Sequence, residues 1–236
     1  VKQVSNSIAH DLRTPIARAR AELEDASRSA TNELALRAAI DQAAVNLDKV
    51  TGICEALLRI AQIEAGTRRS AFAIFDLATT LRDITELYEA VADEHGLRLQ
   101  RNFPLHLPFR GDQAMFQQAL ANILDNAIKF SPPQGTINLS AQHIPAASSA
   151  EHAQTGTIRI MVVDSGIGMN DADLARASER FFRAEQARHT PGSGLGLALV
   201  QAIVELHGGT LLLSHNNPGL AVTIDVPAIY DYPDKL

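Results

Sequence analysis

The sequence predicts two structural parts. The first is an all-α helical hairpin, and the second is an α/β (α+β) sandwich in which helices pack on a β-sheet. Residues 1–66 are rich in Ala, Leu, Glu and Arg and contain a single Pro, a composition typical of long helices. After residue 70, Gly, Pro and β-branched residues return, and segments of strand length alternate with helical ones. We therefore assign 1–66 to a helical domain, 67–74 to a linker and 75–236 to a second domain.

The helical part carries two apolar stripes. Positions spaced alternately by four and three residues are Leu36, Ile40, Ala43, Leu47, Val50, Cys54, Leu57 and Ala61, and an upstream stripe consists of Ile8, Leu12, Ile16, Ala19, Leu23 and Ala26. The polar segment 27–32 is the expected turn between the two helices. One narrow hairpin buries too little apolar surface, so we expect a homodimer through residues 1–66 that forms a four-helix bundle. Cys54 lies on this seam and is expected in the core.

The second part alternates predicted helices and strands. Helices are expected over 77–94, from the N-cap Asp112 to about 129, and over 197–207, and strands near 97–101 and over 136–144 and 157–163. A loop over 145–156 joins the last two strands, an irregular stretch runs from 169 to 196, and a hairpin over 210–214 and 220–226 ends the domain. Strand pairs interleaved with helices that do not cross over predict an α+β sandwich.

Composition and charge exclude several classes of protein. Lys and Arg number 21 against 27 Asp and Glu, a net charge of -6, so we expect no nucleic-acid partner. The single cysteine excludes a disulfide framework and a cysteine zinc cluster. The histidines other than His10, including His207, show no metal-ligand spacing, and most are expected at the surface or in loops. No apolar run approaches the ~20 residues that span a bilayer, so membrane contact would depend on a segment outside this chain.

Three reactive side chains share one helix face near the start of the chain. His10 lies two residues from both Ile8 and Leu12, which turns it away from the apolar stripe, and Thr14 follows one turn later with Asp11 alongside. A neutral imidazole is a nucleophile, and a neighbouring carboxylate can hold one ring nitrogen protonated. Taken alone, the pattern is more typical of an ordinary solvated histidine.

The helix over 113–129 presents Asn122, Asn126 and Lys129 on one face, because they are spaced four and three residues apart. Two amides and an ammonium suit an Mg²⁺ ion that carries phosphates. The same spacing also occurs on solvated helix faces.

Two glycine-containing segments and the stretch between them complete the set of motifs. In Asp164-Ser-Gly166-Ile-Gly168, an acid directly after an apolar strand could accept a hydrogen bond from an adenine amine, although a plain turn with an Asp cap explains these residues equally well. Gly192-Ser193-Gly194-Leu195-Gly196 opens a helix, where backbone amides bind phosphates. Between them, Arg180 and Arg183 flank two phenylalanines in a segment that suits a mobile lid whose arginines reach phosphates.

These motifs in this order resemble the catalytic core of bacterial two-component sensor histidine kinases over essentially the whole chain. The resemblance implies that 1–66 is a dimerisation and histidine phosphotransfer domain and that 75–236 is a Bergerat-type ATP-binding domain. It also implies that the γ-phosphoryl group of Mg-ATP passes to a histidine and then to an aspartate in the receiver domain of a response regulator. Such cores usually follow a sensor and transmembrane helices, so the expected location is the cytoplasmic portion of an inner-membrane sensor protein.

The resemblance further implies a role for each motif. His10 would accept the phosphoryl group, Asp11 would orient or deprotonate it, and Thr14 would position the water that dephosphorylates the regulator. Asn126 would be the principal Mg²⁺ ligand, with Asn122 beside it and Lys129 on the phosphates. Asp164 would anchor adenine within the Gly166 and Gly168 turn, Arg180 and Arg183 would belong to the lid, and Gly192, Ser193, Gly194, Leu195 and Gly196 would flank the phosphates.

One residue departs from the wider ATPase superfamily. Gyrase-like, heat-shock-chaperone and mismatch-repair ATPases carry a Glu where this chain has Asn122, and an amide cannot serve as their general base. We therefore expect the site to hold ATP without hydrolysis until an imidazole reaches the γ-phosphate. Pro191 stands where many members of the histidine kinase family have a glycine. We expect it to stiffen that end of the lid, with only a modest effect.

Two other functions remain open at this point. One is a serine-specific kinase or another Bergerat ATPase, and the helical hairpin that carries His10 argues against it. The other is a catalytically inactive dimerisation module that binds nucleotide only to change its conformation, and the intact glycine motifs argue against it.

Overall fold

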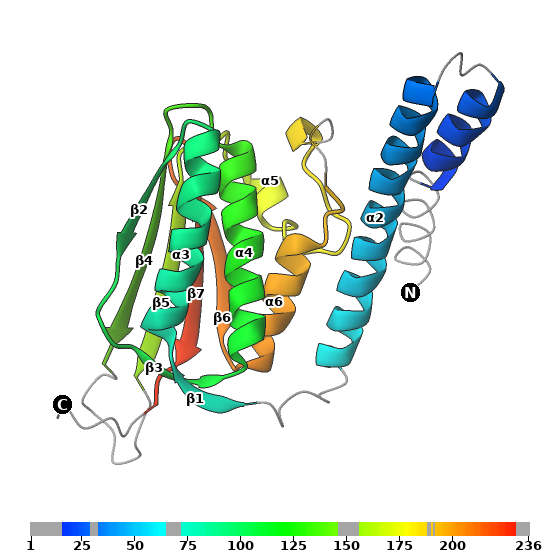
Figure 1. The fold of residues 1–236 in the computed structure, drawn as a ribbon. Coiled ribbons are helices and arrows are strands. Elements are labelled where there is room, and N and C mark those ends of the chain that lie inside the picture. Colours follow the sequence, from blue (N-terminus) through cyan, green and yellow to red (C-terminus); the bar gives the residue numbers. More distant parts are fainter. Residues whose placement is uncertain are drawn as a thin grey trace. The chain divides into compact units, whose positions relative to one another are not determined.

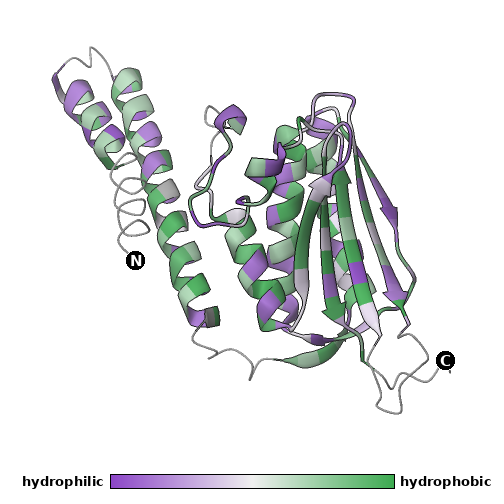
Figure 2. Cartoon of the chain, turned by 180° about the vertical axis from the view of Figure 1, so that it is seen from behind, coloured by the Kyte–Doolittle hydropathy of each residue, from purple (hydrophilic) through white to green (hydrophobic). Residues whose placement is uncertain are grey.

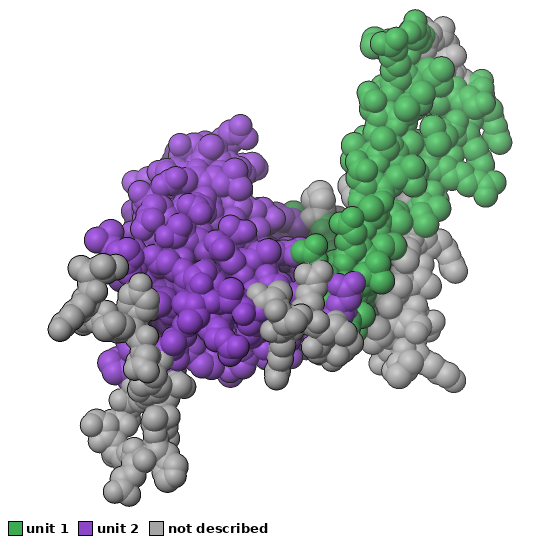
Figure 3. All heavy atoms as spheres, turned by 60° about the horizontal axis from the view of Figure 1, so that its bottom comes forward, with its two compact units in different colours: residues 1–61, 179–195 green, residues 62–178, 196–236 purple. Residues whose placement is uncertain are grey.

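The computed structural model describes residues 16–28, 33–64, 72–145, 156–187, 190 and 192–229. The chain divides into two compact units, coloured separately in Figure 3. The first, here called the helical unit, comprises residues 1–61 and 179–195, and the second, the sheet unit, comprises 62–178 and 196–236. No helix among the described residues is long and apolar enough to cross a membrane.

Two helices lie side by side in the helical unit, one over residues 16–28 and α2 over Glu33–Glu64 (Figure 1). Ala19 on the first helix and Ala43 and Ile53 on α2 are buried. Asn46 is buried as well, and its Nδ2 donates a hydrogen bond of 2.9 Å to Oε2 of Glu22. This polar pair links the two helices across their shared face, because the two residues belong to different helices of the pair.

The predicted stripe on α2 separates into two neighbouring faces. Ala43 is buried, whereas Leu36, Ile40 and Leu47 are 43%, 50% and 50% exposed. Cys54, which was expected in a core, is exposed within the single chain, so that prediction is wrong for this chain by itself. The reason is its place on the helix, which is two heptads from Ile40 and therefore on the same exposed line.

The sheet unit is built on a five-stranded sheet with the strand order β2-β4-β5-β7-β6. These strands are β2 (Arg98–Asn102), β4 (Thr136–Ile144), β5 (Thr157–Asp164), β6 (Thr210–His215) and β7 (Leu220–Pro227). Helices α3 (Leu77–Glu94), α4 (Gln113–Phe130) and α6 (Gly196–Leu206) cover one face of the sheet, as Figure 1 shows. The predicted α+β sandwich is thus confirmed.

The core of the sheet unit lies between these helices and the sheet. Residues alternate along β5 between buried and half-buried, so one face of the strand packs into the core. Figure 2 shows both hydrophobic and hydrophilic residues along the strands of the sheet. The helices contribute fully buried Phe116, Leu120 and Leu124 from α4. This packing fixes which flank of α4 remains available for polar side chains.

Several elements differ from the prediction. β1 (Ala73–Asp76) and β3 (Pro108–Gly111) form an additional antiparallel pair, and the segment expected to be irregular contains α5 (Asp171–Leu174) and the 3₁₀ helix η2 (Glu185–Ala187). β2 pairs with β4 in parallel, so the connection through α4 is a crossover, contrary to the expectation. Most of the linker and of the loop over 145–156 lie outside the described residues.

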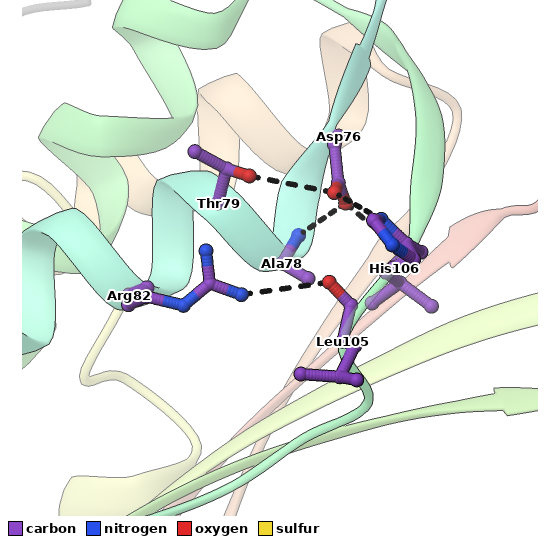
Figure 4. A network of polar contacts seen from close by, with 7 residues as sticks. Asp76, Ala78, Thr79, Arg82, Leu105 and His106 are labelled. Atoms are coloured by element: carbon purple, nitrogen blue, oxygen red, sulfur yellow. Dashed lines mark hydrogen bonds and ion pairs between the residues drawn. The ribbon is translucent and has the colours of Figure 1, made fainter.

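The start of α3 is fixed by a network around Asp76 (Figure 4). Its Oδ1 accepts hydrogen bonds from the backbone amides of Ala78 at 3.0 Å and Leu107 at 2.8 Å, and its Oδ2 from His106 and Thr79. Burial alone would raise the pKa of Asp76, but these hydrogen bonds outweigh burial and hold the pKa below its usual value. Asp76 therefore caps α3 and fastens the β2–β3 loop to it.

His207 is buried, so the expectation that most histidines lie at the surface or in loops does not describe it. Its Nε2 accepts a hydrogen bond of 3.0 Å from the amide of Asp112, its Nδ1 donates to the carbonyl of Ile203 at 2.7 Å, and its ring stacks on Phe72. This pattern requires the neutral ring, and burial lowers the pKa of His207 accordingly. The end of α6 is thereby tied to the start of α4.

Candidate functional site

The polar face predicted on α4 follows from how this helix starts and packs. Oδ1 of Asp112 accepts the amide of Met115 at 3.1 Å, which begins the helix at the predicted residue. Ile123, Leu124 and Ala127 are buried. Because these residues take the core side, Asn122 and Asn126 lie on a flank of the helix. Nζ of Lys129 lies 4.9 Å from the centroid of the Phe130 ring at the end of α4.

The first residue of α6 lies against this flank. A Cβ placed on Gly196 would be 3.8 Å from Nδ2 of Asn126 and 3.9 Å from Cγ of Asn122, which is ordinary contact distance. The Nδ2 atom of Asn122 is buried without a hydrogen-bond partner among the described residues. The unpaired amides of a helix N-terminus and a buried amide donor therefore meet at one place, as an anion-binding site requires.

Asp164 ends β5 and is 7% exposed. Its Oδ1 accepts hydrogen bonds from the amides of Gly166 at 2.8 Å and Leu220 at 3.1 Å. Burial raises the pKa of Asp164, and the two hydrogen bonds offset only part of that rise. Within the part of the chain that the structure describes, its Oδ2 accepts no hydrogen bond, so one carboxylate oxygen is available to a donor from a ligand.

The turn after Asp164 lies against the end of α4, in the half of the helix that also carries the two asparagines. The amide of Ile167 donates to the carbonyl of Phe130, the last residue of α4, at 3.3 Å. Gly168 has φ +67°, and a Cβ there would be 2.9 Å from the carbonyl oxygen of Gly219. A side chain at this position would separate the turn from the β6–β7 hairpin, which explains the need for glycine.

Residues 179–195 form part of the helical unit. The amide of Phe181 donates to the carbonyl of Gly194 at 3.0 Å, and a Cβ on Gly194 would be 2.8 Å from the carbonyl oxygen of Phe182. The predicted lid motif and the glycine motif thus lie side by side. Oγ of Ser193 accepts the amide of Leu195 at 3.4 Å, and Gly192 is exposed.

The two arginines of this segment have different surroundings. Nη2 of Arg183 donates hydrogen bonds to the carbonyls of Ala187 and Thr190, which holds the segment around η2 together. Arg180 is half-buried. A structural task for Arg183 was not predicted, because its carbonyl partners are identified only by the path of the backbone.

Tyr88 is a contributor to the surroundings of the site that the sequence did not reveal. Its hydroxyl donates to Oδ1 of Asp125 at 2.8 Å from α3, next to Asn126. Burial, together with the hydrogen bond and charge of Asp125, raises the pKa of Tyr88. This pair fixes α4 against α3 on one flank, while the asparagines occupy the other.

Part of the predicted site cannot be placed. His10, Asp11, Thr14 and Pro191 lie outside the described residues. The residues that the structure does bring together are Asn122, Asn126, Asp164, its glycine turn and Gly196. Their arrangement can bind an adenine amine at one point and phosphates at another.

Residues 111–229 match the family model of histidine kinase-, DNA gyrase B-, and HSP90-like ATPases, just over half of the chain. The chain belongs to this family. Membership in this family indicates that the nucleotide bound at the site is ATP. The matched residues include α4, the Asp164 turn and α6.

Several curated relatives are named as histidine kinases. SenX3 of Mycobacterium tuberculosis is 28% identical over 228 residues, which are 95% of this chain and 53% of that protein. BaeS of Escherichia coli is 29% identical over 226 residues, 93% of this chain and 45% of that protein. The chain therefore spans about half the length of the curated relatives it matches. It corresponds to the catalytic region of a two-component sensor histidine kinase.

Solved structures agree on the fold. Histidine kinase AdeS of Acinetobacter baumannii superposes with a TM-score of 0.69 at 22% identity and covers 94% of this chain and 98% of its own. Full-length ShkA in complex with AMPPNP gives a TM-score of 0.68 at 24% identity, over 98% of this chain and 47% of that one. The mycobacterial sensor histidine kinase MprB is 26% identical with a TM-score of 0.55, over 66% of this chain and 97% of that one.

Proposed function

We propose that this chain binds Mg-ATP where α4 meets the start of α6 and passes the γ-phosphoryl group to His10. The observation that carries the proposal is the close approach of Gly196 to Asn122 and Asn126, where Nδ2 of Asn122 is buried and has no hydrogen-bond partner among the described residues. Donors concentrated at a helix N-terminus bind phosphate. Membership in the ATPase family supports the nucleotide.

Adenine binding would use Asp164. Its Oδ2 accepts no hydrogen bond among the described residues, and an exocyclic amine is a donor of the required kind. The rest of the carboxyl group is held by backbone amides, so its direction is fixed before the nucleotide arrives.

The donor set also fits Mg²⁺. The described residues contain no cluster of three or more His, Cys, Asp or Glu placed to bind a metal, so an ion here would need amide oxygens together with phosphates. Asn126 and Asn122 would hold it, and Lys129 would contact the phosphates. When bound, Mg²⁺ would neutralise part of the phosphate charge.

The phosphoryl transfer would use the patch around His10. A bond forms between an imidazole nitrogen and the γ-phosphorus while the bond from phosphorus to the bridging oxygen breaks, and its electron pair leaves with ADP. Asp11 would accept the proton from the other ring nitrogen. Asn122 cannot deprotonate a water, so competing hydrolysis would lack a general base.

The later steps follow the same family pattern. The phosphoryl group would move from His10 to an aspartate carboxylate of a response regulator. In the reverse role, Thr14 would position the water that removes it from the regulator. The relatives are sensor proteins, and the location on the cytoplasmic side of a membrane stays a prediction.

A homodimer is supported by the second apolar face of α2. Leu36, Ile40 and Leu47 are each about half exposed and are spaced four and seven residues apart, with Cys54 on the same line. An apolar line of this length beside the face already used in the hairpin fits a second copy of the same hairpin.

The test of the kinase proposal is transfer of label from γ-labelled ATP to the wild-type protein and to His10→Ala. We expect acid-labile, base-stable label on the wild type and none on the variant. Equal acid-labile label on both proteins would reject His10 as the acceptor. Acid-stable label would favour the serine kinase, and bound nucleotide without label would favour the silent module.

The phosphatase role has its own test. Thr14→Ala should autophosphorylate at the wild-type rate but dephosphorylate the regulator about 10-fold or more slowly, because water positioning is lost. An unchanged rate of dephosphorylation would reject the role of Thr14.

A further inference from the structure

Asp164, the proposed acceptor for the adenine amine, is held by the turn that joins β6 to β7. The pairing of β6 with β7 ends at His215 and Leu220, and within the turn the amide of Asn216 donates to the carbonyl of Gly219 at 3.1 Å. The amide of Leu220, directly after the turn, donates to Oδ1 of Asp164 at 3.1 Å. The position of this turn therefore decides where one of the two carboxylate oxygens is bound.

One side chain fastens the turn to the strand that carries Asp164. Nδ2 of Asn216 donates to the backbone carbonyl of Asp164 at 2.7 Å and to the carbonyl of Pro218 at 3.2 Å. The NH₂ group of an asparagine has two hydrogens and its carbonyl oxygen has none, so only the nitrogen can face these two acceptors. Asn216 thus joins the tip of its own turn to the end of β5.

The hydrogen bond from Asn216 acts where the pairing of the strands stops. β5 pairs with β7 as far as Val163 and Ala221, so Asp164 lies one residue beyond the last pair. The side chain of Asn216 supplies a hydrogen bond to the carbonyl of Asp164 at this point. The end of β5 is therefore held by a side chain that a substitution can remove without changing the strands.

The turn also lies very close to Asp164. Gly219 has φ +118°, and a Cβ placed on it would overlap the backbone carbonyl oxygen of Asp164. The turn can approach this closely only because Gly219 has no side chain, and the hydrogen bond from Asn216 holds it there. A turn released from Asn216 would move the Leu220 amide away from Oδ1, and the carboxylate of Asp164 could then rotate.

We propose that Asn216 is a positioning residue of the adenine site. By holding the β6–β7 turn on the end of β5, it keeps the Leu220 amide on Oδ1 of Asp164 and leaves Oδ2 to accept the exocyclic amine. The proposal rests on the proposed function, because it assumes that Asp164 accepts this amine. It makes Asn216, which does not contact the nucleotide, a determinant of selectivity for adenine over purines that lack the amine.

The test compares the dissociation constants of ADP and of purine riboside diphosphate, in which a hydrogen replaces the amino group, both with Mg²⁺. In the wild type, the hydrogen bond to a carboxylate should make ADP bind about 10- to 100-fold more tightly than the analogue. Asn216→Leu keeps the approximate size of the side chain but removes both donors. We expect this variant to lose about tenfold in affinity for ADP and to bind the analogue as the wild type does.

Two further variants complete the test. Asn216→Ala also removes both donors, leaves space where Leu fills it, and should lower the preference for ADP to a similar extent. Asn217→Leu is the matched control, because Asn217 belongs to the same turn and is exposed. It should keep the wild-type preference.

Three results would overturn the proposal. They are an unchanged preference for ADP in the Asn216 variants, an equal loss of affinity for both nucleotides, as a purely structural role would give, and the same loss of preference in Asn217→Leu. A wild-type protein that binds both nucleotides equally would contradict Asp164 as the adenine acceptor, and with it the role of Asn216. Because that result is seen in the wild type alone, the two failures are distinguishable.

Discussion

The two units of the molecule leave opposite kinds of groups unsatisfied. On α2, the apolar side chains of Leu36, Ile40 and Leu47 are exposed to solvent. On α4, the polar atoms Oε1 of Gln118 and Nδ2 of Asn122 are buried without a hydrogen-bond partner among the described residues. Each departs from the usual rule that apolar groups are buried and buried polar groups are paired.

The difference indicates what each unit binds. Exposed apolar side chains in a line are stabilised by another apolar surface, which for a heptad pattern is a helix. Buried polar donors beside a helix N-terminus are stabilised by a charged ligand. The helical unit is thus suited to a protein partner and the sheet unit to a nucleotide, and the predictions below test this contrast in order of expected effect.

The largest effect is expected for Leu47→Glu on dimer formation. Each dimer would bury two copies of Leu47, worth roughly 3 kcal/mol together, so the dissociation constant should rise by about a hundredfold or more. Val45→Glu is the control, because Val45 is 47% exposed but lies on another side of α2. Sedimentation equilibrium measures both, and a Leu47→Glu protein that dimerises as tightly as Val45→Glu would contradict the account.

Asp164→Asn is expected to weaken nucleotide binding and to stabilise the protein. Burial raises the pKa of Asp164, so its contribution to stability is present at low pH and is lost as pH rises through the folded-state pKa. A neutral amide avoids that loss at pH 7 but places an NH₂ group against the adenine amine, which should reduce affinity by about 10- to 100-fold. Calorimetric binding and chemical unfolding at pH 7 measure the two effects. A variant that is less stable and binds normally would break the contrast.

The hydrogen bond between Tyr88 and Asp125 should contribute to the stability of the fold and not to nucleotide binding. Tyr88→Phe removes the hydrogen bond to Asp125, and the free energy of unfolding should fall by about 1.5 kcal/mol, since the acceptor is charged. Asp125→Asn should cost a similar amount, and the double variant should cost less than the sum. Urea unfolding gives these values, and an additive double variant would show that the two side chains do not interact.

The smallest effect is a pH dependence from His207. Burial lowers the pKa of His207, so its contribution is present above the unfolded pKa of about 6.5 and is lost as pH falls from there through the folded-state pKa. His207→Phe should flatten the stability profile between pH 7.5 and 5, whereas the exposed His95→Phe should not. Thermal unfolding measured across this pH range tests the prediction. A dependence of stability on pH that is equally steep in His207→Phe and in the wild type would contradict the role assigned to His207.

Features encoded locally could be predicted from the sequence. Asp112 is a good N-cap residue, and α4 begins directly after it. Asn122 and Asn126 share a face because the helix spacing requires it, and Asp164 ends a strand because the apolar run before it stops there. For each of these, the residues that decide the outcome lie within one or two turns of each other.

Features that depend on distant partners could not be predicted. His207 is buried because it meets Asp112, 95 residues earlier, and Phe72. The strands β1 and β3 have four residues each, too few to show a periodic pattern. The parallel pairing of β2 with β4 is a property of the whole sheet.

The contrast between the units is tested most directly by amide hydrogen exchange with and without Mg-AMPPNP. The account predicts slower exchange in residues 122–130, 164–168 and 196–199, and no change on α2 around Ile40 and Leu47. Bound nucleotide that leaves those three segments unchanged, or that protects the exposed line of α2 instead, would contradict the claim that the unsatisfied polar atoms mark the nucleotide site.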